Sequence, residues 1–235
     1  MLARACAEAG IPAVFSYAGR VANPRTQPVE MRIGGFGGPD GLACWMRDHA
    51  ITHLIDATHP FAAQMSTNAV AAAGQTGILL LAFEREPWVP QPGDNWRMVP
   101  DMEAAVAALG GPARRVFLGL GRLNLHAFAA QPQHFYLLRL VDAPDEPLPL
   151  QNCDAVIARG PFMLENDLAL LKQHAIDCVV AKNAGGDAAR AKIDAARHLG
   201  LEVIMIERPA VPLRPVARNL DAVMNWLCHG ADLGV

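Results

Sequence analysis

The sequence predicts an α/β protein built from two Rossmann-like domains with mostly parallel sheets. Short apolar runs typical of buried strands alternate along the whole chain with longer segments of helical periodicity. This alternation is typical of βαβ units, in which a helix connects two parallel strands. The composition is globular, with 52% hydrophobic and 18% charged residues among 235. A chain of this length forms one domain or two small ones.

The first half of the chain contains four predicted strands, at residues 13–17, 29–33, 52–57 and 78–83. Helices are predicted at residues 2–9, 39–50, 64–73 and 101–111, and residues 84–100 are expected to form an irregular, proline-rich connection. Two boundaries carry clear signals. Pro39 suits a first helical turn, and Asp101 caps a helix that Gly110 and Gly111 terminate.

The second half continues the alternation, with strands predicted at residues 115–120, 135–140, 154–159, 178–181 and 202–206. Helices are predicted at residues 123–130, 162–174, 187–200 and 216–227. In the second of these helices, Leu164, Leu168 and Leu171 recur at helical spacing. Because Gly-Gly-Pro at 110–112 separates the two series, we expect one domain at residues 1–110 and another at 111–235.

Composition and charge exclude several classes of function. The net charge of −3 and the pI of about 6.2 argue against a general nucleic-acid surface. No apolar run approaches the roughly 20 residues that span a bilayer, and the N-terminus lacks the pattern of a signal peptide. The five cysteines are scattered without a CxxC pair, as expected for a cytoplasmic protein. His49 and His53 have the spacing of a metal pair, but a predicted strand interrupts that helical face, so no metal is expected.

Polar and glycine-rich residues follow six of the predicted strands. In parallel sheets, ligands bind beyond the carboxyl ends of the strands, at the point where the strand order reverses. The six segments are YAGR (17–20), GGFGG (34–38), DATHPFA (56–62), GLGRLN (119–124), ARGPF (158–162) and AKNAGGD (181–187). Turn chemistry alone rarely produces so many unusual strand ends, so the sequence predicts a ligand site at these edges.

The strand ends of the first half have the residues of a dinucleotide site. Glycines in GGFGG allow a phosphate to approach backbone N–H groups at a helix N-terminus, although a plain turn is an alternative. Arg20 suits a ribose 2′-phosphate, with a solvated surface arginine as its alternative. Pro60 restricts the backbone of His59 and would hold the imidazole at the sheet edge. His59 is therefore a candidate functional residue, with a structural histidine as the alternative.

The strand ends of the second half have residues that suit a carboxylate ligand. Lys182 and Asn183 follow a strand and precede Gly185 and Gly186, which combines a point charge with accessible N–H groups. Arg159 stands in the same relation to its own strand. The alternative interpretation of each basic residue is an exposed charge with no ligand.

DATHPFA followed by AQMSTNA, the later KNAGG and the VIMIERP segment together resemble the precorrin-6A reductase family of cobalamin biosynthesis. YAGR, RIGGFGG and ARGPF fit that family's pattern in order, and the resemblance runs from about residue 10 to residue 209. It implies an NADPH-dependent oxidoreductase that reduces one double bond of the precorrin-6A macrocycle, or of its cobalt form, to give precorrin-6B. Residues 1–110 would then bind NADPH, and residues 111–235 would close the substrate cleft.

The resemblance also implies roles for individual residues. Cofactor binding is expected at Tyr17, Arg20, Gly35, Gly37, Thr58, His59 and Pro60. Substrate binding is expected at Phe61, Arg122, Arg159, Lys182, Asn183, Gly185 and Gly186. His59 is the expected catalytic group, as the donor or orienter of a proton. The cofactor carries the hydride chemistry, so no protein nucleophile is required. We expect a monomer whose partner is the corrin-precursor substrate.

One feature departs from the family pattern. Members usually open with a hydrophobic strand and a Gly-Gly-Thr turn, whereas Met1 here falls inside what reads as the first helix. We therefore expect that the first strand of the N-terminal domain is missing and that the true start lies upstream. Two other functions stay open: another NAD(P)-dependent reductase of a small substrate, and a non-catalytic tetrapyrrole-binding protein.

Overall fold

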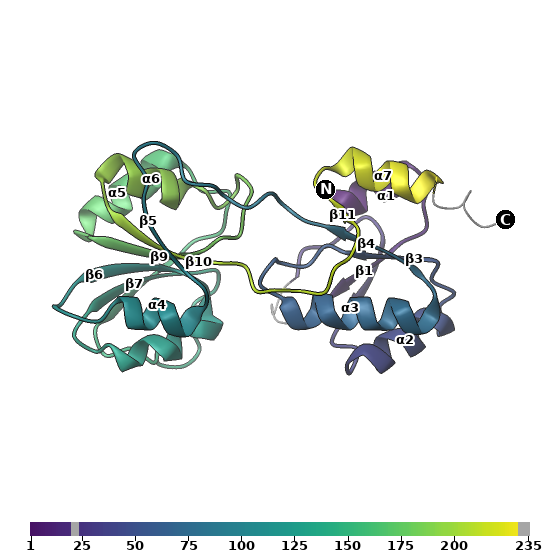
Figure 1. The fold of residues 1–235 in the computed structure, drawn as a ribbon, viewed down its shortest axis with the longest axis horizontal. Coiled ribbons are helices and arrows are strands. Elements are labelled where there is room, and N and C mark those ends of the chain that lie inside the picture. The colour runs from purple at the N-terminus through teal and green to yellow at the C-terminus, as the bar shows by residue number, and fades with distance from the viewer. Residues whose placement is uncertain (20–23, 230–235) are drawn as a thin grey trace. The chain divides into compact units, whose positions relative to one another are not determined.

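The computed structural model describes residues 1–19 and 24–229 and divides the chain into two compact units. Unit 1 comprises Met1–Arg85 and Ala210–Val235, and unit 2 comprises Glu86–Pro209 (Figure 1). These boundaries differ from the expected division at residues 110–112. The difference arises because the chain already enters the second sheet before residue 110, and because its last part returns to unit 1.

Unit 1 contains two small parallel sheets. In one sheet β1 (Val14–Tyr17) pairs with β2 (Glu30–Ile33), and in the other β4 (Leu79–Phe83) lies between β3 (His53–Asp56) and β11 (Val216–Ala217). The helices are α1 (Leu2–Glu8), α2 (Pro39–Asp48), α3 (Ala63–Thr76) and α7 (Leu220–His229). Within the described residues, β1 and β3 each pair with a strand on one side only. The expected missing strand stays a prediction.

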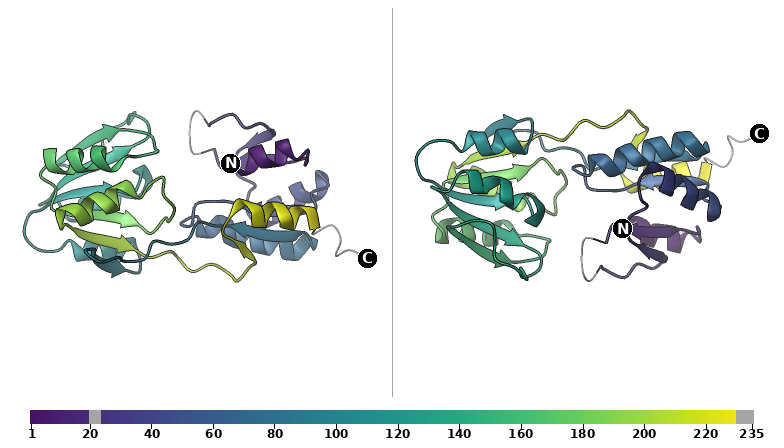
Figure 2. Two further views of the ribbon diagram at one scale, coloured as in Figure 1. Left: turned by 90° about the horizontal axis from the view of Figure 1, so that it is seen from above. Right: turned by 90° about the horizontal axis from the view of Figure 1, so that it is seen from below.

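Two apolar clusters hold unit 1 together. In the first, α2 packs against α3 through small and medium side chains, namely Leu42, Ala43, Met46, Ala69 and Ala72. The alanines on α3 allow close approach of the two helices. In the second cluster, Leu81 of β4 packs with Val223 of α7, and α7 also contacts α1 (Figure 2). The N-terminal and C-terminal helices therefore share one core.

Unit 2 is built on a six-stranded parallel sheet in the order β5-β10-β9-β6-β7-β8. The strands are β5 (Asn95–Val99), β6 (Arg115–Gly119), β7 (Phe135–Leu140), β8 (Cys153–Ile157), β9 (Cys178–Lys182) and β10 (Glu202–Ile206). The helices are α4 (Met102–Ala108), the 3-10 helix η1 (Arg122–Ala130), α5 (Leu164–Gln173) and α6 (Ala191–Leu199). Helices α5 and α6 cover one face of the sheet and α4 lies on the other (Figure 1).

The strand order of unit 2 reverses between β6 and β9. From β6 the chain continues outward through β7 and β8, then crosses to place β9 on the other side of β6. Such a switch point opens a crevice at the carboxyl ends of the two strands, where open α/β sheets bind ligands. The central strands are fully buried, as Phe117, Leu137 and Val179 illustrate. The predicted α/β class with mostly parallel sheets is confirmed.

Two strands contradict the sequence prediction. Residues 84–100 were expected to be irregular, but β5 forms there as an edge strand paired with β10. Four prolines precede or follow its five residues, and the pairing with β10 decides its conformation despite them. Residues 216–217 were expected to begin the last helix, but they pair with β4 as β11. The helix starts later, where Asn219 accepts a hydrogen bond from the backbone N–H of Ala222 at 2.8 Å.

The remaining differences concern helix type and length. The helix expected at 123–130 is present as a 3-10 helix, η1, and α6 begins at Ala191, four residues after the expected start. Among the described residues, no helix combines the length and the apolar character needed to cross a membrane.

Candidate functional site

The DATHPFA turn connects β3 to α3 and is fixed by its own aspartate. Asp56 is buried at the end of β3, and its Oδ1 accepts hydrogen bonds from the Thr58 N–H (3.1 Å) and the Thr58 hydroxyl (2.6 Å). His59 is exposed, and its Nδ1 accepts from the Phe61 N–H at 3.2 Å. With Nδ1 as acceptor, the proton of a neutral imidazole sits on Nε2. The turn therefore holds the imidazole of His59 at the carboxyl edge of β3.

A buried ionic cluster, formed by Asp56, Glu84 and Arg214, lies beneath this turn. The Arg214 guanidinium contacts Glu84 Oε1 at 2.5 Å and Asp56 Oδ2 at 3.5 Å. It also donates to the hydroxyl of Ser66 in the first turns of α3, at 3.4 Å. Arg218 contacts the second oxygen of Glu84 at 3.6 Å. Sequence reasoning missed this cluster, because nothing in the local pattern around Arg214 indicates a partner 130 residues away.

The glycine-rich turn after β2 lies beside the end of β1. The Gly34 N–H donates to the carbonyl of Tyr17 at 2.9 Å. Arg32 holds the turn from the other side, because its guanidinium donates to the carbonyls of Gly34 (2.6 Å) and Gly35 (2.7 Å). Among the described residues, no atom lies within 4 Å of a Cβ added at Gly35 or Gly37, and Gly37 has a φ of +79°. The described part of the chain thus leaves space at these two glycines, shortly before α2.

Within the residues that the structure describes, no side chain caps the N-terminus of α2. Gly38 occupies the cap position with a φ of 100°, so the first N–H groups of this ten-residue helix receive no side-chain acceptor from it. Such N–H groups bind anions well, since the helix dipole also favours negative charge there. Near this end, Gln75 of α3 donates to Asp40 at 2.8 Å, so the first turn of α2 lies against the last turn of α3.

Two further residues that were predicted to bind the cofactor are Tyr17 and Arg20, and both stay predictions. The hydroxyl of Tyr17 is already engaged, because it donates to the carbonyl of Arg25 at 2.9 Å and accepts from Gln27 Nε2 at 2.6 Å. Tyr17 therefore helps to order residues 25–27, before β2. Arg20, the expected partner of a 2′-phosphate, lies outside the described residues.

In unit 2 the KNAGG turn follows β9 and wraps around the segment that enters the unit. The side-chain amide of Asn183 is buried, accepts from the Trp88 N–H at 2.7 Å and donates to the Trp88 carbonyl at 2.9 Å. The Trp88 indole N–H donates to the Gly186 carbonyl at 2.9 Å. At Gly185 an added Cβ would lie 2.0 Å from the Glu86 carbonyl oxygen. These three motif residues therefore fix the backbone of residues 86–88.

The VIMIERP segment supports the same turn. Arg208 donates to the carbonyl of Asn183 at 3.0 Å and to that of Ala184 at 3.3 Å. The two motifs, at residues 182–186 and 203–209, are adjacent in unit 2, because the Asn183 N–H also donates to the carbonyl of Ile206 at 2.9 Å.

Three basic residues lie at the carboxyl edge of the unit 2 sheet. Lys182 ends β9 at the switch point, and burial lowers the pKa of its ammonium group from the usual 10.5. Arg122 and Arg159 follow β6 and β8 and are exposed. Lys192 of α6, which sequence reasoning missed, is buried beside the end of β6. Its Nζ donates to the Ala189 carbonyl at 2.6 Å. The edge therefore carries several positive groups that suit an acidic ligand.

Lys192 also explains why β6 ends in a glycine. A Cβ at Gly119 would lie 2.9 Å from two carbons near the end of the Lys192 side chain, so a larger residue there would require this side chain to shift. The Lys192 ammonium lies 5.0 Å from the centroid of the Trp88 ring, within the range of a cation–π contact. Lys192 therefore joins the end of β6 to the segment that KNAGG holds.

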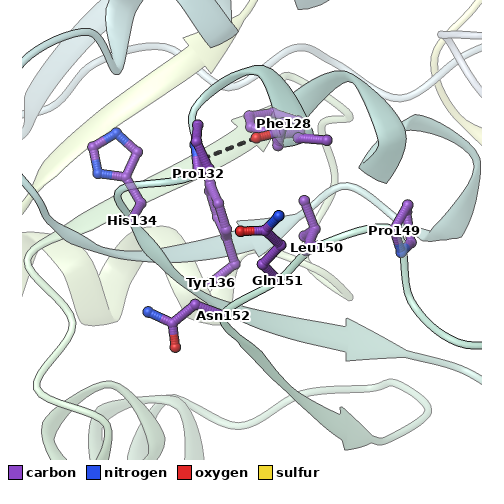
Figure 3. Close-up of a pocket in the computed structure, with 9 residues that line it drawn as sticks. Phe128, Pro132, His134, Tyr136, Pro149, Leu150, Gln151 and Asn152 are labelled. Carbon is purple, nitrogen blue, oxygen red and sulfur yellow. Dashed lines mark hydrogen bonds between the residues drawn. The ribbon is translucent and has the colours of Figure 1, made fainter.

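A separate pocket of unit 2 lies at the opposite edge of the sheet, at the amino ends of β7 and β8 (Figure 3). Its volume of about 110 Å³ is well below that of ordinary ligand pockets. Tyr136 in its wall donates to the carbonyls of Phe128 (3.3 Å) and Gln131 (2.9 Å), and burial raises the pKa of its phenol. His134 is buried with both ring nitrogens hydrogen-bonded. These groups are structural, so the pocket is not the candidate site.

Comparisons with known proteins connect these features to one family. The chain matches the family described as precorrin-6x reductase CbiJ/CobK over residues 1–228. A precorrin-6A reductase from Rhodobacter capsulatus is 58% identical over 231 residues, which cover 98% of this chain and 92% of that protein. A cobalt-precorrin-6A reductase from Priestia megaterium is 30% identical over 213 residues, covering 86% and 82%. A solved structure named CobK precorrin-6A reductase is 57% identical, with a TM-score of 0.94 over 100% of this chain and 92% of that one. This chain belongs to the precorrin-6x reductase family.

Proposed function

We propose that this protein reduces one double bond of precorrin-6A with NADPH to give precorrin-6B, a step of cobalamin biosynthesis. The observation that carries the proposal is the family match over residues 1–228, which includes every strand-end turn described above. In the reaction a hydride passes to one carbon of the double bond and a proton to the other, and NADP⁺ is released. The enzyme is then an oxidoreductase acting on a CH–CH group.

Unit 1 is the proposed NADPH-binding unit. The open space at Gly35 and Gly37 and the uncapped start of α2 fit a phosphate group of the cofactor. Tyr17 borders this turn, and Arg20 is proposed to bind the 2′-phosphate. When bound, NADPH supplies the hydride.

The DATHPFA turn is proposed to act near the nicotinamide. Thr58 and Pro60 fix the backbone of the turn, which holds the imidazole of His59 at the edge of β3. His59 Nε2–H is the proposed source or orienter of the proton, and Phe61 contacts the substrate. General acid catalysis of this kind contributes typically 10²–10⁴-fold in rate.

Unit 2 is the proposed substrate-binding unit. Precorrin-6A carries carboxylates around its ring, and Arg122, Arg159 and Lys182 are proposed to bind them. Asn183, Gly185 and Gly186 shape the turn that positions Lys182. Because the amide of Asn183 is occupied by Trp88, Asn183 is proposed to act on the substrate through Lys182 and backbone N–H groups instead of through its own side chain.

Titration with NADPH, with and without precorrin-6A, tests the proposal. Saturable NADPH binding, with loss of its near-ultraviolet absorbance only after the macrocycle is added, is the expected result. Binding of the macrocycle without binding of NADPH would instead identify a carrier protein. NADPH oxidation with small carbonyl or alkene substrates, but not with precorrin-6A, would identify a different reductase.

The cobalt-free macrocycle is the proposed substrate. The higher identity to a relative named for precorrin-6A than to one named for the cobalt form, 58% against 30%, supports this choice. Competition between the two macrocycles for the NADPH-bound protein tests it, and a preference for the cobalt form would contradict it.

A further inference from the structure

Four large apolar side chains are exposed at the carboxyl edge of the unit 2 sheet. They form what we call the apolar patch: Leu123, Val141, Ile157 and Met163, each between 49% and 67% exposed. Leu123 follows β6, Val141 follows β7, Ile157 ends β8, and Met163 lies just before α5. Unit 2 has six exposed large hydrophobic residues, so four of them gather where three neighbouring strands end.

The position of the patch requires an explanation. Single exposed apolar residues are ordinary, but several that gather at the ends of neighbouring strands indicate a binding surface, because each exposed Å² forgoes about 25 cal/mol of burial free energy. Ends of three adjacent strands span about 10 Å, since neighbouring strands are about 4.8 Å apart. That width suits a flat polycyclic ring better than one extended side chain.

Positive charge borders the apolar patch. Arg122 precedes Leu123 directly, and Arg159 lies two residues after Ile157. Arg159 pairs with Asp142 at 2.5 Å, but both side chains are about half exposed, and exposed ion pairs of this kind contribute little to stability. Arg159 is therefore able to exchange Asp142 for a carboxylate of a ligand at small cost.

The loop before α5, which carries Met163 of the patch, is held by contacts with its neighbours. Arg139 forms a buried ion pair with Asp167 of α5, and its guanidinium lies 4.2 Å from the centroid of the Phe162 ring. The Phe162 N–H also donates to the carbonyl of Ala188 in the loop after β9, at 3.4 Å. Met163 follows Phe162 directly, so these contacts fix the backbone next to this member of the patch.

We propose that the apolar patch binds one flat face of the corrin-precursor macrocycle, with Arg122 and Arg159 binding carboxylates at the ring's periphery. This inference rests on the proposed function and deepens it by naming the surface that recognises the ring itself. Any basic surface could bind the carboxylates alone, whereas the apolar patch favours a ligand that has a wide apolar ring between its carboxylates. Burial of the ring against Leu123 and Ile157 supplies the affinity, and the arginines fix its orientation.

The test compares a double variant of the apolar patch with a single control variant elsewhere on the surface. The double variant Leu123→Gln/Ile157→Thr removes apolar surface from the patch, and Leu213→Gln removes the same kind of surface from a fully exposed site in unit 1. Precorrin-6A and NADPH are each titrated against both variants and the unmodified protein, and the mass in solution is measured. The expected result is at least tenfold weaker binding of precorrin-6A by the double variant, with NADPH affinity unchanged and Leu213→Gln unaffected.

Several outcomes overturn the inference. Unchanged precorrin-6A affinity in a folded double variant does so, as does equal weakening by Leu213→Gln. If the unmodified protein is a dimer and the double variant is a monomer with unchanged precorrin-6A affinity, the patch instead binds a second copy of the chain. If the double variant fails to fold, Val141→Thr replaces it with the same expected direction. Weakened macrocycle binding together with absence of NADPH oxidation in the unmodified protein supports the patch while refuting the reductase, so the two proposals fail separately.

Discussion

Replacement of Arg214 by methionine is expected to destabilise unit 1 strongly. The side chain of Arg214 is 6% exposed and lies between the carboxylates of Asp56 and Glu84. Methionine fills much of the same volume but removes the positive charge, so both carboxylates stay in the interior without their shared partner. Loss of one partner from a buried ion pair typically costs about 3–5 kcal/mol.

The expected cost lies near the lower end of that range. Arg218 stays 3.6 Å from Glu84 and offsets part of the loss. Asp56 keeps its two hydrogen bonds from Thr58. We therefore expect the free energy of unfolding of unit 1 to fall by about 3 kcal/mol at neutral pH.

Urea unfolding followed by far-ultraviolet circular dichroism measures the change. With a slope of about 1–3 kcal/mol per molar urea, the transition of unit 1 should move to lower urea by roughly 1–3 M. Arg218→Met is the matched control: that side chain is 40% exposed, so its loss should cost under about 1 kcal/mol. Equal small shifts for the two variants would refute the view that a buried charge cluster supports the DATHPFA turn.

Three further outcomes are expected. Lys182→Met should weaken precorrin-6A binding at neutral pH while sparing NADPH affinity. In the unmodified protein, macrocycle affinity should fall as pH rises through the pKa of Lys182, which burial lowers from 10.5, because the cation is then lost. Titrations at several pH values that show the same macrocycle affinity for the unmodified protein and Lys182→Met would contradict this. Gly185→Ala should lower the free energy of unfolding by roughly 2–4 kcal/mol, because the new Cβ would overlap the Glu86 carbonyl and the φ of +68° is strained for alanine. Gly74→Ala in α3 is the control: no described atom lies near the new Cβ, so this variant should raise the free energy of unfolding by about 0.4–1 kcal/mol. Thermal or urea unfolding measures both changes. A thiol reagent at mildly alkaline pH should modify exposed Cys44 but spare Cys178, whose pKa burial raises to about 12, until the protein unfolds; rapid native modification of Cys178, located by mass spectrometry, would count against the buried β9.

Sequence periodicity predicted most strands well because parallel strands buried on both faces are continuous apolar runs. β7 and β10 match the predicted bounds, the other predicted strands differ by a residue or two at an end, and β5 and β11 were not predicted. β5 was missed because its neighbour β10 lies about 100 residues away, and an edge strand has a weak local pattern. The domain boundary was displaced for the same reason: with β5 unrecognised, Gly110 and Gly111 looked like the junction.

The candidate site was predictable as a set of turns but not in its internal contacts. Strand ends and glycines indicate where ligands bind, because sheet topology fixes those edges. The partners of polar side chains are set by tertiary packing that one sequence does not reveal. Asn183 follows a strand as a ligand-binding residue would, yet its amide is paired with the backbone of Trp88. Lys192 gave no signal, since a lysine in an amphipathic helix ordinarily faces solvent.

The discontinuous path of unit 1 has a consequence for biosynthesis. Unit 2 is one continuous stretch, so it is complete as soon as Pro209 has left the ribosome, and domains generally fold as units during synthesis. Unit 1 begins first but needs β11 and α7, which are the last described elements to be made. Its early strands must therefore wait, with apolar surface uncovered, while about half of the chain is translated. A nascent chain arrested shortly before α7 should carry a finished unit 2 and an unfinished unit 1 that invites chaperone binding.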